Sequence, residues 1–155
     1  MHEIPGVEAI AQFRHLIATL GHRFGVAVKD SPPGFADYIA CPGARTPGQV
    51  LAHIHVLVEW STNVVQGGGE RPQEAALVWD QAVRRLYQLL QSLDDAVVHA
   101  EGKAFPIEKL LQGPIADALT HVGQLTMLRR MAGAPVQTDS YFRADISAGQ
   151  FPELL

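Results

Sequence analysis

Four long stretches of the chain carry apolar residues at spacings of three and four, the period of an amphipathic α-helix. Glycine and proline clusters separate these stretches and mark turns between them. The pattern predicts long helices over residues 6–28, 47–66, 72–97 and 114–132. Few segments alternate in the way that strands do. The sequence therefore predicts an all-α fold, an up-down four-helix bundle.

The second predicted helix has the clearest start signal in the chain. Thr46 suits the N-cap position, Pro47 the first helical position, and Gln49 the position that completes a capping box. The last helix has a clear end, because Arg129 and Arg130 precede a glycine and place positive charge at its negative terminus.

Two regions of the second half are less regular. A short helical stretch covers residues 105–111, and Pro114 then either starts the last helix or kinks a continuous one. Both interpretations stay open from the sequence. The tail over residues 136–155 is irregular, and Tyr141 and Phe142 are expected to pack down on the bundle.

Size and composition narrow the class of protein. The 155 residues fit one domain, residues 1–155, and the net charge of −4 without a basic cluster argues against a nucleic-acid surface. Cys41 is the only cysteine, which rules out an intrachain disulfide and a cysteine-rich zinc site and favours a reducing, cytoplasmic setting. The absence of a long apolar run and of a signal-peptide pattern predicts a soluble protein that does not enter a membrane.

Three polar residues lie on one face of the last predicted helix. Asp117, His121 and Gln124 follow one another at spacings of four and three, so their side chains stack. Their apolar neighbours are Ala118, Leu125 and Leu128. Polar groups that are buried on an apolar helix face need a partner to offset their lost hydration. A metal ion and a hydrogen-bond network both satisfy that need.

The second predicted helix offers a further ligand. His53 and His55 are two residues apart and so point to different sides of a helix. His53 shares its face with Leu57 and Trp60, which makes it the better inward histidine. His55 is then expected to be solvated or paired with Glu59.

A competing interpretation places the two histidines on a β-strand, where they would share one face as in barrel-type metallohydrolases. The capping box and the short chain argue against it. His15 and His22 of the first helix are seven apart and are interpreted mainly as partly exposed residues without a metal role.

His53, Asp117 and His121 together supply two imidazoles and one carboxylate. Such a set leaves coordination positions open and suits zinc, iron or nickel. Gln124 is then expected to orient His121 or a bound water.

The same residues carry a family resemblance. The segment Asp117-Ala-Leu-Thr-His121-Val-Gly-Gln124 resembles the last-helix motif of the DinB/YfiT-like superfamily, written His-x-x-x-His-x-Gly-Gln. Residues 46–60, TPGQVLAHIHVLVEW, are similar to the second-helix block of that family, and Gly133-Ala-Pro-Val with the segment 141–146 resembles the tail of one branch.

The resemblance implies a four-helix bundle, often dimeric, with a divalent metal ion held by three side chains. By position the ligands of the family fall on His53, Asp117 and His121. The first residue of the last-helix pair is usually histidine, so Asp117 departs from the motif of the family. In this respect the chain is similar to the related mycothiol-dependent maleylpyruvate isomerases, which have an acidic residue at that place. A carboxylate there favours oxygen-preferring ions.

Two functions follow as expectations. The first is a metal-dependent hydrolase or thiol transferase that acts on a small molecule through metal-bound water or thiolate. A low-molecular-weight thiol is one candidate partner. The second is a metal-stapled, non-catalytic protein that binds a small molecule, for example under stress. A third interpretation retains the polar residues as a hydrogen-bonded core. The sequence shows no separate general base.

Overall fold

The computed structural model describes residues 1–137 and 140–151. Its regular elements in those ranges are all helical, which confirms the all-α prediction. The α-helices are α1 (Val7–Val28), α2 (Pro47–Val65), α3 (Trp79–His99), α4 (Ile107–Leu110) and α5 (Ala116–Met131). A 3₁₀ turn over Phe35–Asp37 precedes α2, and a π-helical turn over Leu111–Ile115 joins α4 to α5. No helix among the described residues is long and apolar enough to cross a lipid bilayer.

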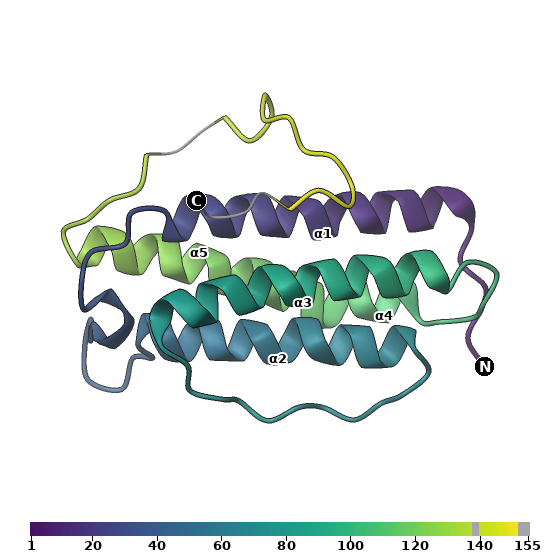
Figure 1. Ribbon diagram of the computed structural model, residues 1–155, viewed down its shortest axis with the longest axis horizontal. Coiled ribbons are helices and arrows are strands. Elements are labelled where there is room, and N and C mark those ends of the chain that lie inside the picture. The colour runs from purple at the N-terminus through teal and green to yellow at the C-terminus, as the bar shows by residue number, and fades with distance from the viewer. Residues whose placement is uncertain (138–139, 152–155) are drawn as a thin grey trace.

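The four long helices form a bundle in which each one packs against two others (Figure 1). The neighbouring pairs are α1 with α3, α3 with α2, α2 with α5, and α5 with α1. One continuous apolar core lies between them, with Phe13, Ile54, Leu90 and Leu125 among its fully buried side chains. Burial of these apolar faces supplies the main driving force for the fold.

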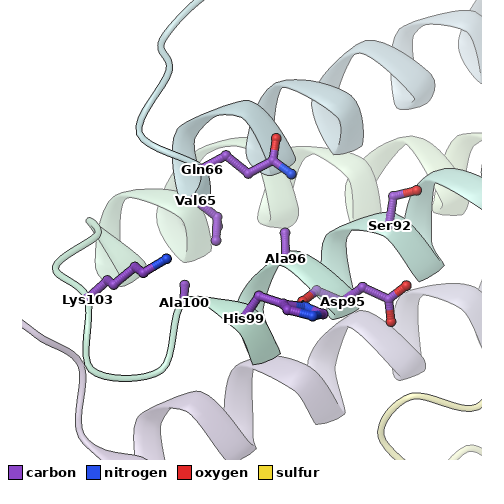
Figure 2. A pocket seen from close by; sticks show the side chains of 8 residues that line it. All are labelled: Val65, Gln66, Ser92, Asp95, Ala96, His99, Ala100 and Lys103. Carbon is purple, nitrogen blue, oxygen red and sulfur yellow. The ribbon is translucent and has the colours of Figure 1, made fainter.

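The direction of α3 corrects the simple up-down order expected from the sequence. Figure 1 shows that α2 and α3 run the same way, joined by a segment that returns along the outside of the bundle. Figure 2 shows the ends of both helices meeting at one cavity of about 410 Å³, where Val65 and Gln66 of α2 face His99 and Ala100 at the end of α3. The bundle therefore contains two parallel pairs of neighbouring helices, α2 with α3 and α1 with α5, since the C-terminal ends of α1 and α5 also meet.

This return segment explains why α3 begins at Trp79 and not near Pro72, as the periodicity predicted. The 19 residues of α2 span about 28 Å at 1.5 Å per residue. Residues 66–78 cover that length only when extended, because a helix of the same residues would span about 20 Å. Leu77 and Val78 stay exposed, whereas Trp79 packs edge-on against Phe35 at 5.4 Å between ring centroids.

The N-terminus of α2 confirms the predicted capping box. The Thr46 hydroxyl oxygen accepts a hydrogen bond from the Gln49 backbone N–H at 3.3 Å, and the Gln49 side-chain oxygen accepts one from the Thr46 N–H at 2.9 Å. Position 48 favours glycine, because a Cβ atom at Gly48 would come within 3.1 Å of the Ala36 carbonyl oxygen. The chain is thus fixed tightly where α2 begins.

The structure decides between the two interpretations of Pro114. The helical run continues from α4 into α5, and Pro114 lies inside the π-helical turn. Proline lacks an N–H and its ring crowds the carbonyl group one turn earlier, and the wider turn accommodates both effects. Asp117 lies in the first turn of α5, directly after this adjustment.

The described part of the tail lies along α1 (Figure 1). The Tyr141 ring meets the edge of His22 at 6.1 Å between centroids, and the Arg23 guanidinium lies 4.0 Å from its centre. Phe142 is 99% exposed. The expectation that both aromatic residues pack on the bundle is therefore correct for Tyr141 and wrong for Phe142, because Tyr141 already occupies the contact with α1.

Candidate metal centre

The bundle brings together the three residues predicted as metal ligands. His53 projects from α2, and Asp117 and His121 lie one turn apart on α5, the helix packed beside it. One potential ligand atom from each residue lies within 4.8 Å of the others. The two imidazole rings are 4.6 Å apart between centroids, and the His53 Nε2 is 3.3 Å from the Asp117 Oδ2. These separations suit three donors around one ion.

The Nδ1 atom of each histidine already has a hydrogen-bond partner. His121 Nδ1–H donates to the Asp117 backbone carbonyl at 2.8 Å, and the Asp117 Oδ1 lies 3.2 Å from the same nitrogen. His53 Nδ1–H donates to the Glu74 Oε1 at 2.9 Å. In the neutral tautomer that carries its proton on Nδ1, Nε2 of each ring has a lone pair that can serve as a ligand.

The second ring nitrogen of His53, Nε2, lies 3.3 Å from the Asp117 Oδ2. A proton on Nε2 makes this contact a hydrogen bond, and a divalent ion between the two atoms makes it coordination. Both imidazole side chains are nearly buried, at 11% exposure for His53 and 12% for His121. Two imidazole nitrogens and a carboxylate oxygen at these separations are donors that a divalent ion accepts, so the donor set fits a metal.

Glu74 is the residue of this centre that the sequence did not reveal. It lies in the extended return segment, where a helix was predicted, and it contacts a histidine 21 positions earlier. No spacing in the sequence links the two residues. A carboxylate on the Nδ1 of a ligating histidine is a common outer partner that fixes the ring and raises its basicity.

Other polar residues singled out in the sequence take different positions. Gln124 is exposed beside His121, and no hydrogen bond joins the two within the described residues, so its orienting role stays a prediction. His15 is exposed. The His22 ring packs against Tyr141, away from the cluster of ligand atoms.

The structure corrects the prediction for His55. It is buried, not solvated, and its Nε2–H donates to the Ala82 carbonyl of α3 at 2.8 Å. Glu59 instead approaches Arg85 of α3 at 3.8 Å. The sequence suggested one buried face, but α2 packs between α3 and α5 and so buries two. Because α2 is helical, the strand interpretation of His53 and His55 is wrong.

His55 should make stability depend on pH. Burial lowers the pKa of its folded form below 6.5, so the unfolded chain binds the proton first as the pH falls. The stability associated with neutral His55 is present above pH 6.5 and is lost as the pH falls toward the folded pKa. Urea unfolding with a chelator should show a steeper loss between pH 6.5 and 5.5 in wild type than in His55→Gln, by up to about 1.4 kcal/mol per pH unit. Parallel curves would contradict this account.

A cavity of about 560 Å³ opens beside the two histidines. Its lining comprises Ala44, Arg45, Val50, His53, His121, Gln124, Met127 and Leu128. This volume lies within the range of small-molecule sites, about 300–1,000 Å³. A molecule bound there would touch the candidate ligands directly.

Comparison of the chain with protein-family models, with curated proteins and with solved structures gave no match.

Proposed function

We propose that the protein is a DinB/YfiT-like, divalent-metal-binding helical bundle that acts as a hydrolase or thiol transferase on a small molecule. The observation that supports this most strongly is the convergence of His53, Asp117 and His121, with both imidazoles held through Nδ1. A small-molecule cavity lies against the same two imidazoles.

The side chains have separate roles in this proposal. His53, His121 and the Asp117 carboxylate would hold the ion, for which zinc, nickel and iron are the candidates. When bound, such an ion acts as a Lewis acid that lowers the pKa of a bound water or thiol and polarises a carbonyl group. Glu74 orients the His53 ring.

Neither His55 nor Glu59 of α2 is placed to act as a general base. His55 and Glu59 both contact α3, whereas His53 faces α5 on the other side of the helix. In the proposed chemistry, the low pKa of the reacting water or thiol would therefore come from its contact with the ion and not from a neighbouring side chain that accepts the proton.

A non-catalytic metal-stapled binding protein is the second candidate function. The cavity and the donor set support it equally, because neither requires turnover. Preparations with graded metal content separate the two candidates. If the protein is an enzyme, the rate of thiol transfer or ester hydrolysis should rise in proportion to bound metal. Full loading without any metal-dependent rate across thiol and ester substrates would favour the binding protein.

Glu74→Gln should weaken Zn²⁺ binding about 10-fold. The amide accepts a weaker hydrogen bond from His53 Nδ1–H than the carboxylate does, so the ring becomes less basic and less well oriented. Competition with a chromogenic chelator measures the affinity. Glu70→Gln, an exposed change in the same segment, is the matched control and should bind as wild type does. Equal affinity in both variants would remove the role assigned to Glu74.

The setting of the protein belongs to the same proposal. We propose a cytoplasmic homodimer, on the basis of the single cysteine and of the family resemblance. Sedimentation of untagged protein measures the oligomeric state.

A further inference from the structure

The cavity beside the candidate metal centre has one formally charged side chain in its lining, Arg45. The remaining lining residues are the two histidines, neutral Gln124, and small or apolar side chains, among them Val50 and Leu128. The cavity thus combines an apolar wall, a cluster of potential metal ligands and a single positive charge. This combination suits a ligand that is partly apolar and carries one negative charge.

The charge of Arg45 is available to such a ligand. Within the residues that the structure describes, no carboxylate lies within 4.0 Å of its guanidinium, whereas Arg14 and Arg85 both have acidic partners. Its backbone is held in place, since Arg45 directly precedes Thr46 of the capping box. Arg45 is an exposed residue in the cavity lining, so its side chain can meet a ligand there.

We propose that this cavity selects small organic carboxylates, with Arg45 as the residue that determines specificity. The carboxylate of the ligand pairs with the Arg45 guanidinium, its apolar part lies along Val50 and Leu128, and its other end reaches the ion held at His53 and His121. One arginine balances the single charge of a carboxylate and matches its planar geometry. This inference rests on the proposed function because it requires the metal centre.

Cobalt-substituted protein provides the test, since binding of a thiolate to Co²⁺ gives a charge-transfer absorption band. The probes are ω-mercaptocarboxylic acids with chains of two to six carbons, each compared with the ω-mercapto alcohol of the same length. At the length that best spans the cavity, the acid should bind about 10-fold more tightly than the alcohol.

Variants separate the effect of Arg45 from general electrostatics. Arg45→Gln should abolish the preference for the acid without changing Co²⁺ content, and Arg45→Lys should retain part of it. Arg84→Gln, an exposed change on α3 outside the cavity lining, should bind as wild type does.

Each outcome bears on a different claim. A preference for the acid that survives in Arg45→Gln, or equal binding of acid and alcohol at every length, would overturn the specificity assigned to Arg45 and leave the metal centre intact. Failure of the wild-type protein to bind Co²⁺ would overturn the proposed function, and this inference with it.

Discussion

Replacing Arg129 by methionine should lower the free energy of unfolding by about 3 kcal/mol. Arg129 is only 4% exposed. Its guanidinium donates to four backbone carbonyl oxygens: those of Ala27 at 3.1 Å, Lys29 at 2.8 Å, Asp30 at 3.2 Å and Ala134 at 2.9 Å.

These contacts tie the end of α5 to the end of α1. Methionine has a similar length but no hydrogen-bond donor. It would therefore leave these backbone carbonyl groups without partners where water has little access. Burial also lowers the pKa of Arg129, and the guanidinium nevertheless keeps its charge because the pKa of arginine lies far above neutral pH. The planar guanidinium group directs its N–H donors at several carbonyl groups at once, which a lysine ammonium group does not do. Arg129→Lys should therefore recover only part of the lost free energy of unfolding.

Arg130 provides the matched control for this prediction. It follows Arg129 on α5 and is exposed, so Arg130→Met should change the free energy of unfolding by less than about 0.5 kcal/mol. Urea unfolding of the three variants and wild type measures the difference. If Arg129→Met were as stable as Arg130→Met, the carbonyl contacts would have no net value.

Replacing His121 by alanine should weaken Zn²⁺ binding at least about 100-fold, because loss of an outer partner alone costs about 10–100-fold. The change removes one of the three proposed donors and leaves only His53 and Asp117 to bind the ion. Zinc at 100 times its dissociation constant should stabilise wild type by about 2.7 kcal/mol, and the same concentration should hardly stabilise the variant.

His15→Ala is the control for a general effect of removing a histidine, since His15 is exposed on α1. It should keep the affinity and the stabilisation of the wild type. Calorimetric titration gives the affinity, and thermal unfolding with and without zinc gives the stabilisation. Unchanged zinc binding in His121→Ala would eliminate it as a ligand.

Local sequence signals predicted the parts of the fold that local interactions decide. The capping box at Thr46 marked the start of α2, and the apolar periodicity located α1 and α5 closely. The approach of His53 to His121 followed because both histidines lay on apolar faces that had to be buried, whereas the Asp117 side chain is 45% exposed at the edge of the cluster.

The residues that the sequence misplaced depend on which helices are neighbours. His55 is buried because α2 packs against α3 as well as α5, which periodicity along one helix does not reveal. Glu74 reaches His53 only because α2 and α3 run parallel, so that the segment between them returns along α2. Arg129 was expected at the end of its own helix, yet its partners include carbonyls about 100 positions earlier.

Elemental analysis of the untagged protein, with wild type beside Asp117→Ala, tests the central claim most directly. Asp95→Ala, an exposed change on α3, is the control, and circular dichroism checks that each variant is folded. We predict close to one divalent ion per chain in wild type and in the control, and little in Asp117→Ala. A folded wild-type protein that binds no zinc, nickel or iron when these ions are supplied would show that the polar cluster is structural, and would contradict this account.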